Sequence, residues 1–491
     1  MPLRKTASLL TAALLSAAGC STAPKSPPAP PPGADPLVFA AEHRAERLAW
    51  WSDARFGMFI HFGLYSEHAG IWPGTPCGRY SEWLISHGIP PEEYRSVLTK
   101  RFNPAKFDAA GWVRLAKTAG MKYIVITTKH HEGFALWDSA ASDYNAVKNT
   151  PFRRDILLEL AEACRREGIR LGFYYSVLDW YHPDYLPRRK NPQFPPDNDT
   201  RPVAGADFSR YLAFMNAQLA ELLGGRYGNI AVLWFDGGWD HDAKGYHSEE
   251  AVRNIYAMQP GIIINDRIAL PMDFATPEQE VPDRKIPARP WETCMTMNGS
   301  WGYKAGDDKW KSAQVLIRTL ADVASKGGNF LLNVGPDGAG VIPAPSVERL
   351  KAVGQWLEVN GEAIYGTTAS PLPKRPFWGR YTLRRGAKGR DTLYVHVFNW
   401  PRDGQLEVPG LTQMPKRARI LGIVERTSLP SPVAVTLFKG GLGLNLPAKM
   451  PNPDDTVIAL DFNGPLPLRL EPEPAAGDGA GNTAPPPNPA P

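Results

Sequence analysis

Residues 37–366 alternate between amphipathic segments and short apolar runs. A representative unit is 108–118, where apolar side chains recur at helical spacing, followed by Gly120 and by the apolar run 122–128. Aspartate before such a segment and glycine after it are typical of the two ends of a helix. The same pattern predicts helices at 156–167, 208–223, 249–258 and 312–326, and strands at 56–62, 170–175, 229–235, 262–265 and 329–334.

Strands that alternate with helices favour a parallel sheet with the helices packed outside it. An open, doubly wound sheet is the competing topology. Neither a GxGxxG nor a GxxxxGK[ST] motif follows the first predicted strand, and polar residues end nearly every strand rather than one switch point. We therefore predict a TIM-like (β/α) barrel, in which residues at the C-terminal ends of the strands face the active site.

The pattern changes after residue 366. Short runs at 391–398, 405–408, 417–421, 433–438, 442–446 and 456–462 are separated by turns rich in proline and glycine. Such spacing is typical of an antiparallel β-sandwich. We expect a barrel over 37–366, followed by a sandwich over 367–473 that has a structural or auxiliary role.

Composition adds limits to this picture. A chain of 491 residues with 43% apolar and 21% charged residues fits two globular domains plus tails. The net charge of +5 is small for this length and no dense Lys/Arg run occurs, so we expect no nucleic-acid partner. Cys77, Cys164 and Cys294 lack CxxC spacing, which argues against a disulfide framework or a zinc site. A single bridge between Cys77 and Cys294 stays open.

The two ends of the chain differ from the domains between them. Arg4 and Lys5 precede a short apolar stretch, and small residues then lead to Cys20, as in a bacterial lipoprotein signal. We expect residues 1–19 to be removed, Cys20 to carry the lipid, and the proline-rich residues 20–36 to form an extended spacer. The protein would then be exported to the outer membrane or periplasm of a Gram-negative bacterium, with the lipid as its only membrane anchor. Ordinary secretion is the alternative, and residues 474–491 are expected to be disordered.

Asp236 is the sharpest candidate for chemistry. It ends an apolar run in the sequence LWFDGG, and Gly237 and Gly238 leave the backbone bare behind it. A carboxylate at the C-terminal edge of a barrel can serve as nucleophile, general base or metal ligand, whereas its ordinary structural role would be to cap the next turn. Trp234, two residues earlier on the same strand face, favours the ligand-binding interpretation.

Three histidines accompany this aspartate at predicted strand ends: His61, His130 and His131. Neighbouring residues on a strand point to opposite faces, and no HExxH motif or third clustered ligand stands nearby. A neutral imidazole donates a hydrogen bond from one nitrogen and accepts one at the other, which suits vicinal hydroxyl groups. We therefore expect these histidines to recognise hydroxyls, and we expect neither a metal nor a cofactor.

A glycosidase would need a second carboxyl group to protonate the leaving oxygen. The candidates are Glu278 and Glu280, in the segment DFATPEQE, and Glu292 in PWET. Each also has a plain structural interpretation, because the first two can be surface charges of a loop and the third a buried, paired carboxylate.

A set of short motifs resembles the α-L-fucosidases of glycoside hydrolase family 29. In chain order they are FGMFIHFG (56–63), SEWL (81–84), TTKHHEGF (127–134), GFYYS (172–176), LWFDGG (233–238), NDR (265–267), PWETC (290–294), SWGY (300–303) and GGNFLLNVGPDG (327–338). The resemblance implies a TIM-like barrel, a C-terminal β-sandwich and a retaining mechanism without a metal. It also implies that Asp236 is the nucleophile, which forms a covalent glycosyl-enzyme with fucose.

The same resemblance implies a set of fucose-binding residues: His61, Glu82, Trp83, His130, His131, Tyr174, Trp234, Arg267 and Trp301. DFATPE matches a family segment whose glutamate is the acid/base, which points to Glu278, with Glu292 as its rival and Glu280 as a weaker candidate. The expected function is that of an exo-acting retaining α-L-fucosidase that hydrolyses terminal α-L-fucose of glycans or glycoconjugates. The alternatives are another retaining glycosidase of similar fold and a catalytically silent fucose-binding protein.

Overall fold

The computed structural model describes residues 30–73, 78, 80–186, 204–283, 285–372, 375–423 and 433–469. The expected signal segment, Cys20, Cys77 and the C-terminal tail 474–491 lie outside these ranges. Cys294, the other half of the bridge left open above, is a buried free thiol. In the ranges that the structure describes, no helix combines the length and the apolar character needed to span a bilayer.

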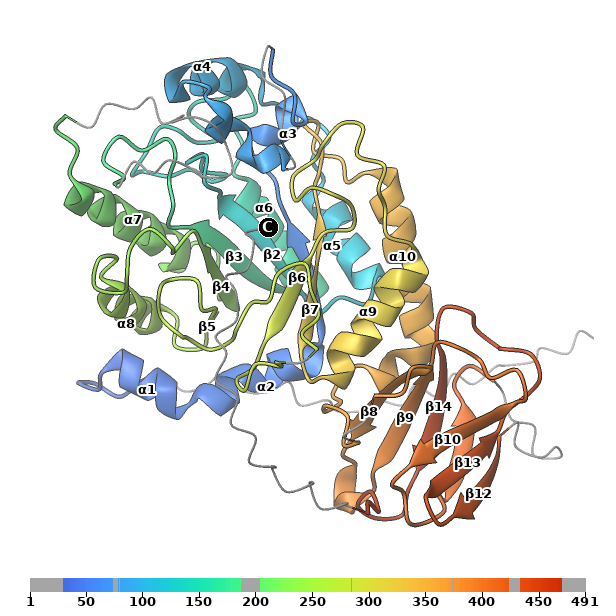
Figure 1. The fold of residues 1–491 in the computed structure, drawn as a ribbon. Helices are drawn as coiled ribbons and strands as arrows, with labels where there is room; N and C mark the ends of the chain where they lie inside the picture. The colour runs from blue at the N-terminus through green and yellow to red at the C-terminus, as the bar shows by residue number, and fades with distance from the viewer. Residues whose placement is uncertain are drawn as a thin grey trace, which may run out of the picture.

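The centre of the larger domain is a curled, parallel sheet whose strands have the order β5-β4-β3-β2-β1-β7-β6 (Figure 1). The strands are β1 (Phe56–Ile60), β2 (Tyr123–Lys129), β3 (Arg170–Ser176), β4 (Val232–Asp236), β5 (Ile263–Ile264), β6 (Glu292–Met295) and β7 (Asn329–Val334). Because β1 lies between β2 and β7, the chain winds in one direction around a barrel, which confirms the TIM-like fold over the doubly wound one.

Helices cover the outside of this sheet (Figure 1). They are α5 (Ala109–Thr118), α6 (Ile156–Glu167), α7 (Phe208–Leu223), α8 (Ser248–Met258), α9 (Ala313–Ser325) and α10 (Ala344–Asn360). Asp155 caps α6 as expected, and Asp108 and Asp207 cap α5 and α7 in the same way; each accepts a backbone N–H of the first turn. The sequence pattern did not predict α10, although it is 17 residues long.

Further short helices close the two ends of the barrel. They are α1 (Pro36–Glu42), α2 (Arg44–Ala54), α3 (Tyr65–His68), η1 (Ser81–His87) and α4 (Pro91–Arg101). The side-chain amide of Asn329 donates to the carbonyl oxygen of Trp51 at 2.8 Å, and Phe330 N–H donates to Arg55. Helix α2 therefore packs at the N-terminal end of the strands, whereas α3 and α4 lie at the opposite end, above the strand termini (Figure 1).

The barrel closes irregularly between β5 and β6. The segment 274–278 forms single parallel bridges there, from Phe274 to Asn265 on one side and from Ala275 and Glu278 to the β6 side on the other. Pro277 has no N–H to give to a regular ladder, which keeps this segment from becoming a strand. The seam has a functional consequence, because it carries Glu278 to the same barrel edge as Asp236.

The C-terminal domain is an antiparallel sandwich, as expected. One sheet has the order β11-β14-β9-β8 and the other β10-β13-β12. The elements are β8 (Gly379–Arg384), η3 (Ala387–Gly389), β9 (Thr392–Val397), β10 (Gln405–Pro409), β11 (Arg417–Ile420), β12 (Ala434–Phe438), β13 (Gly441–Asn445) and β14 (Thr456–Asp461). Alternating side chains such as Leu393, Val395 and Leu444 form a second hydrophobic core, between the two sheets of this domain.

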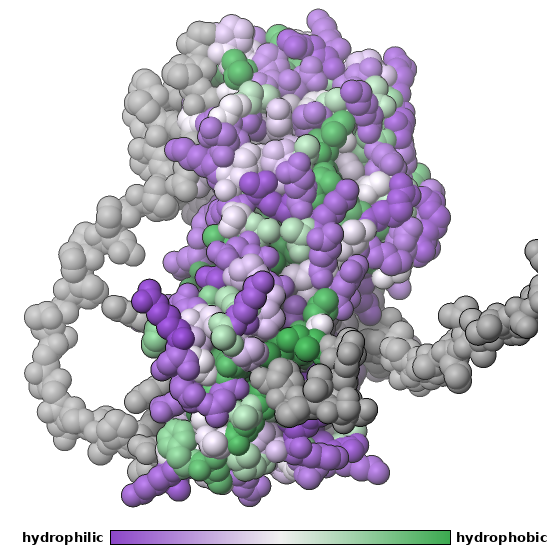
Figure 2. Space-filling view, turned by 90° about the vertical axis from the view of Figure 1, so that its right-hand side faces the viewer, coloured by the Kyte–Doolittle hydropathy of each residue, from purple (hydrophilic) through white to green (hydrophobic). Residues whose placement is uncertain are grey.

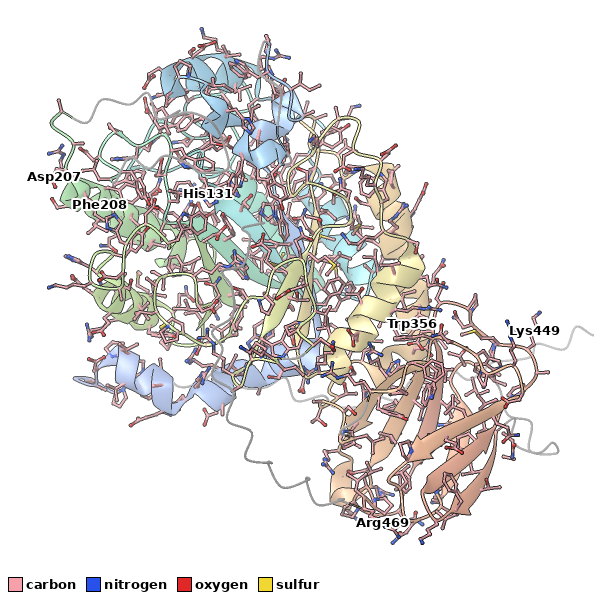
Figure 3. All side chains as sticks on the ribbon, in the orientation of Figure 1. His131, Asp207, Phe208, Trp356, Lys449 and Arg469 are labelled. Atoms are coloured by element: carbon pink, nitrogen blue, oxygen red, sulfur yellow. The ribbon has the colours of Figure 1, made fainter. Side chains whose placement is uncertain are left out.

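The sandwich packs against α9 and α10, and η2 (Gly361–Ala363) leads toward it. Arg318 of α9 donates to the carbonyl oxygens of Phe398 and Asp454 at 2.7 and 2.8 Å. Trp356 of α10, which lies at the junction of the domains in Figure 3, donates its indole N–H to Asp455 at 2.9 Å. Seen from the right-hand side of Figure 1, the surface of the barrel is mainly hydrophilic (Figure 2).

Candidate active site

A cavity of about 200 Å³ opens at the C-terminal end of the parallel strands. Its lining residues are Phe59, His61, Tyr80, Trp83, His130, His131, Tyr174, Trp234, Asp236, Trp239, Arg267, Glu278, Cys294 and Trp301. A larger cavity, of about 650 Å³, lies near the N-terminal ends of β3 and β4, and none of the candidate residues lines it. Most of the sequence candidates thus meet in the smaller cavity, at the barrel end where such folds place their chemistry, whereas Glu82, Glu280 and Glu292 do not line it.

A side chain holds the backbone just before Asp236, at a position where the neighbouring strand β5 no longer pairs with β4. β4 and β5 pair over only two residues. Beyond them the side-chain amide of Asn265 accepts from the N–H of Phe235 and donates to its carbonyl oxygen, both at 2.8 Å. Gly237 follows with φ +80°, and a Cβ there would lie 2.4 Å from the side chain of Leu178. These contacts explain why the carboxylate stands where the strand ends and the chain turns.

Asp236 is held as an anion. Arg267 donates to its Oδ1 at 3.0 Å and Tyr174 donates to its Oδ2 at 2.9 Å, while His131 Nε2 lies 3.7 Å from Oδ2. Burial alone would raise the pKa of Asp236, but the charge of Arg267 and the hydrogen bonds from Arg267 and Tyr174 lower it below its ordinary value. The result is a buried, ionised carboxylate aimed into a small cavity.

Two pocket histidines each have a fixed tautomer. The Ser176 hydroxyl donates to the carbonyl oxygen of Leu178 at 2.6 Å, so it accepts from the Nδ1–H of His131, also at 2.6 Å. The Nδ1–H of His61 donates to the amide oxygen of Asn333 at 2.7 Å. Burial lowers the pKa of His131 to about 4 and that of His61 to about 3. Both rings are therefore neutral at pH 7, and each keeps Nε2 as an acceptor for a ligand hydroxyl.

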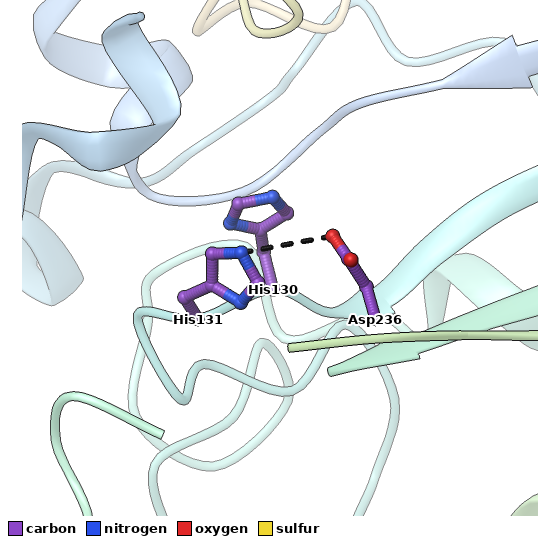
Figure 4. Close-up of side chains that lie close together, drawn as sticks. All are labelled: His130, His131 and Asp236. Carbon is purple, nitrogen blue, oxygen red and sulfur yellow. Dashed lines mark ion pairs between the residues drawn. The ribbon is translucent and has the colours of Figure 1, made fainter. Parts of the chain in front are cut away.

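His130 lies against this group and stacks on Tyr174, with ring centroids 5.4 Å apart and planes 6° apart. Among the described residues, its buried Nδ1 has no hydrogen-bond partner. The ligand atoms of His130, His131 and Asp236 lie within 4.8 Å of one another, a geometry that could hold a metal ion (Figure 4). However, Arg267 already places a guanidinium against the same carboxylate, and a divalent cation there would meet that charge. The donor set thus suits an uncharged polyol better than a cation.

Glu278 is the second carboxylate of the cavity. The same guanidinium that binds Asp236 through Nη1 binds Glu278 Oε2 through Nη2 at 2.8 Å. Arg267 is itself fixed by Thr276, whose Oγ1 accepts from Nε at 2.9 Å. The Glu278 side chain is 39% exposed and that of Asp236 is 13% exposed. The guanidinium of Arg267 therefore lies between the buried carboxylate of Asp236 and the more exposed carboxylate of Glu278 at the cavity mouth, and it is hydrogen-bonded to both.

The other acidic candidates lie elsewhere. Glu292 is the first residue of β6, at the N-terminal end of the barrel, and its carboxylate accepts hydrogen bonds from Trp51, Tyr123 and Trp234. It lies behind Trp234 and does not line the cavity. Glu280 is exposed and outside the cavity as well.

Glu82 also differs from its expected placement at a sugar hydroxyl. It is fully buried, and its Oε2 accepts from the N–H of Gly302 at 2.9 Å and from Ser300 Oγ at 3.3 Å. It does not line the cavity. In this structure it supports the loop that carries Trp301, and its burial raises the pKa of its carboxyl to about 7.

Sequence reasoning missed several residues of the site. Trp239, Tyr80 and Phe59 line the cavity, and Asn333 orients His61. A signal was present for two of them, because Trp239 directly follows the FDGG motif and Asn333 lies within NVGPDG. The arrangement as a whole combines an ionised carboxylate, a second carboxylate within reach of solvent, neutral hydroxyl acceptors and aromatic faces. Two carboxyl groups on either side of one bound sugar are what glycoside hydrolysis requires.

Comparisons with known proteins agree with this geometry. A family model described as Alpha-L-fucosidase matches residues 39–362. The α-L-fucosidase of Dictyostelium discoideum is 30% identical over 82% of this chain and 89% of its own. The structure of α-L-fucosidase isoenzyme 1 from Paenibacillus thiaminolyticus is 38% identical, with a TM-score of 0.74 over 87% of this chain and all of that one.

A further solved structure bears on the reaction itself. It is a trapped covalent intermediate of a family 29 α-L-fucosidase from Bacteroides thetaiotaomicron, formed with 2-fluoro-fucosyl fluoride on a Glu-to-Gln mutant. It is 33% identical, with a TM-score of 0.73 over 84% of this chain and 95% of that one. A covalent intermediate in a relative supports a retaining mechanism. On these matches and on its fold, the chain belongs to the α-L-fucosidases of glycoside hydrolase family 29.

Proposed function

We propose that this enzyme is an exo-acting, retaining α-L-fucosidase in which Asp236 is the nucleophile and Glu278 the general acid/base. The observation that carries the proposal is the single guanidinium of Arg267, which binds both carboxylates at one cavity. The cavity is smaller than the roughly 300 Å³ at which sites for drug-sized ligands begin, so its volume of about 200 Å³ suits one terminal sugar ring.

The proposed reaction has two steps. In the first, an oxygen of Asp236 attacks C1 of fucose, the bond from C1 to the glycosidic oxygen breaks, and Glu278 gives its proton to that oxygen. In the second, Glu278 takes a proton from water, the water oxygen adds to C1, and the bond to Asp236 breaks. Two inversions give net retention. The buried, ionised state of Asp236 and the more exposed position of Glu278 support this division of roles.

Recognition of the sugar follows from the neutral histidines and the aromatic wall. His61 and His131 each keep one acceptor nitrogen for a hydroxyl, since their other nitrogen is already bonded. Trp234 and Trp301 are nearly fully buried, at 1% and 7% exposure, and offer apolar faces to the 6-deoxy methyl group. A methyl contact contributes only a few kcal/mol, so the hydroxyl partners are proposed to select the sugar stereochemistry.

Two alternatives are less well supported. A silent fucose-binding protein would not need a second carboxylate held on the same guanidinium as the first. A glycosidase for a sugar with a 6-hydroxyl would be expected to place a polar partner where this cavity has indole rings. Comparing aryl α-L-fucoside with aryl β-D-galactoside separates these cases, and faster turnover of the galactoside would contradict the fucose assignment.

The proposal for the ends of the chain follows the sequence alone. Acylation at Cys20, with residues 20–36 as a spacer, would hold the enzyme at the outer membrane or in the periplasm. Mass spectrometry of the mature N-terminal peptide tests this proposal.

The decisive experiment for the mechanism uses an activated aryl α-L-fucoside with and without azide. Asp236→Ala should lose nearly all turnover. Glu278→Ala should form the fucosyl-enzyme but hydrolyse it slowly, because an aryl leaving group needs little protonation and water needs the base. Azide needs no base and should restore turnover of Glu278→Ala with α-L-fucosyl azide as the product, because azide then attacks the covalent intermediate. Azide that took the place of the missing Asp236 carboxylate would instead invert C1 and give the β anomer. Glu280→Ala, which changes an exposed glutamate in the same segment, is the matched control and should behave like wild type. Azide rescue of a Glu292 variant would instead assign the acid/base role to Glu292.

A further inference from the structure

We propose that Trp239 forms the stacking face of an aglycone subsite, which binds the pyranose ring to which the terminal fucose is attached. The inference rests on the proposed function and extends it, because it assigns a place and a chemical class to the leaving group.

The first observation is the exposure of Trp239 beside the nucleophile. Trp239 lies three residues after Asp236, lines the same cavity, and is 51% exposed. The other indoles of the inner wall, Trp234 and Trp301, are nearly completely buried. Because Trp239 lines the same cavity as the nucleophile, its exposed indole offers an apolar face, with a polar N–H at its edge, at the place where a ligand leaves the cavity.

The second observation is the size of the cavity. A volume of about 200 Å³ accommodates one sugar ring and not two. A fucose whose C1 reaches Asp236 therefore leaves its glycosidic partner outside the cavity. Glu278, which would protonate the oxygen between the two sugars, is the more exposed of the two carboxylates, at 39%. The departing sugar is thus at the mouth, where Trp239 offers its ring.

The third observation is that this indole packs on His131, a ring that other groups hold in place. The His131 ring contacts Trp239, Trp180 and Trp83 at centroid distances of 5.7, 5.0 and 6.1 Å, all in edge-to-face geometry. Trp83 and Trp180 also pack edge to face at 5.4 Å. His131 itself is anchored by Ser176. A preorganised ring loses little conformational entropy when a ligand stacks on it.

The chemistry of the subsite identifies the class of ligand. Pyranoses of the β-D-gluco and β-D-galacto type carry C–H groups together on one face, and such faces pack on indole rings. Within the described part of the chain, no hydrogen bond is made by the indole N–H of Trp239, so it is free to donate to a sugar hydroxyl. Trp239 therefore favours a hexopyranose as the leaving group.

The test compares two substrates that share the fucose and differ in what occupies the mouth. One is a disaccharide of α-L-fucose on a β-galactoside, and the other is α-L-fucosyl fluoride, whose leaving group is a single atom. Trp239→Ala should lower kcat/KM for the disaccharide about tenfold more than for the fluoride, which corresponds to about 1.4 kcal/mol of stacking on the aromatic ring. Trp239→Phe should restore most of this difference. Phe377→Ala removes an aromatic side chain that is 88% exposed and outside the cavity, and it should leave both values unchanged.

The outcomes are distinguishable. An equal loss on both substrates would mean that Trp239 only shapes the fucose pocket, and no loss on either would mean that the exposed ring binds nothing; both overturn the subsite. If wild-type enzyme turned over neither substrate, the proposed fucosidase function itself would be wrong. A larger loss on the disaccharide, with recovery in Trp239→Phe, supports the proposal.

Discussion

At the scale of single residues, the site depends on amide and hydroxyl groups that never touch the sugar. Asn333 is the clearest case. Its Nδ2 donates to the carbonyl oxygen of Trp301 at 2.7 Å, which orients the amide so that Oδ1 accepts from His61. Without that acceptor, His61 could carry its proton on Nε2 instead of Nδ1, and it would then offer the ligand no acceptor nitrogen. Asn333 is a positioning residue that fixes both a histidine tautomer and the Trp301 loop.

Asn333→Ala should therefore weaken fucose binding. Leaving the buried His61 N–H without a partner costs about 1–3 kcal/mol, so we expect kcat/KM for an aryl fucoside to fall at least about fivefold, mainly through KM. Steady-state kinetics checks this expectation. Asn360→Ala is the matched control, because Asn360 is a buried asparagine whose side-chain amide donates to Trp356 within α10. The idea fails if both variants change kcat/KM equally, or if Asn333→Ala changes kcat alone.

At the scale of elements, the seam between β5 and β6 sets the position of Glu278. Gln279, the next residue, has φ +58°, a left-handed conformation that costs a non-glycine residue energy. Its backbone N–H donates to Cys294 at 2.9 Å, and its side-chain amide bonds Thr296 through both ends, at 3.1 and 3.2 Å. These bonds to the β6 strand hold a turn that the isolated sequence would not adopt, and the turn directs Glu278 toward Arg267.

Gln279→Ala should loosen this turn and misplace the acid/base. A substrate with a poor leaving group needs the proton of Glu278, whereas a dinitrophenyl fucoside needs it little. We expect kcat/KM to fall about tenfold on a fucosyl disaccharide, since a misplacement near 1 Å has large effects on rate, and much less on the dinitrophenyl fucoside. Gln314→Ala, which removes an amide from α9 far from the seam, serves as the control. Equal losses on the two substrates would contradict a role of Gln279 in positioning the acid.

The sequence predicted elements well where a local signal marked both ends. The aspartate caps and terminal glycines of α6 gave its bounds to the residue, and β7 was equally clear from its apolar run. Helix α10 was missed because it packs against both the barrel and the sandwich, so its apolar positions do not form a single stripe. The role of Glu292 could not be settled from sequence. It depends on whether Glu292 lies at the N-terminal or the C-terminal end of β6, a strand that the sequence pattern did not predict.

The sequence did not predict the seam between β5 and β6, or the exposed indole of Trp239 at the cavity mouth, for a related reason. Glu278, Arg267 and Trp239 belong to irregular segments whose course depends on contacts with distant parts of the chain, such as the bridge from Glu278 to Cys294. Motif resemblance named the first two residues and passed over the third. Pattern reasoning thus located the strand ends that face the site, and only the fold shows which loop residues join them.

At the scale of the whole molecule, buried ionisable groups around the barrel act on stability in opposite directions. Burial lowers the pKa of His61, His130 and His131, so below about pH 6.5 the unfolded chain binds protons that the folded protein refuses. Stability contributed by these residues is lost as the pH falls. Burial raises the pKa of three glutamates, to about 7 for Glu82 and Glu292 and about 8 for Glu132.

For the glutamates the sign is reversed. Between about pH 4.5 and pH 7–8 the folded protein keeps protons that the unfolded chain has released, so their contribution to stability is lost as the pH rises. From about pH 4.5 to 6.5 the two sets oppose each other. We expect the free energy of unfolding to change little with pH in this range. It should fall as the pH rises from 6.5 to 8, and it should also fall as the pH drops below 4.5.

Glu292→Gln isolates one term of this balance. The amide cannot ionise, so the free energy of unfolding of the variant minus that of wild type should rise from pH 4.5 to 7 by roughly 3 kcal/mol and then stay constant. Urea unfolding at pH 5, 6, 7 and 8 measures this change, whatever fixed offset the amide introduces among Trp51, Tyr123 and Trp234. Glu358→Gln, at an exposed position of α10, is the control for the same exchange of a glutamate for its amide. A constant difference for Glu292→Gln would mean that the folded protein already holds Glu292 ionised at pH 5, against the cost of burying an unpaired carboxylate among neutral donors.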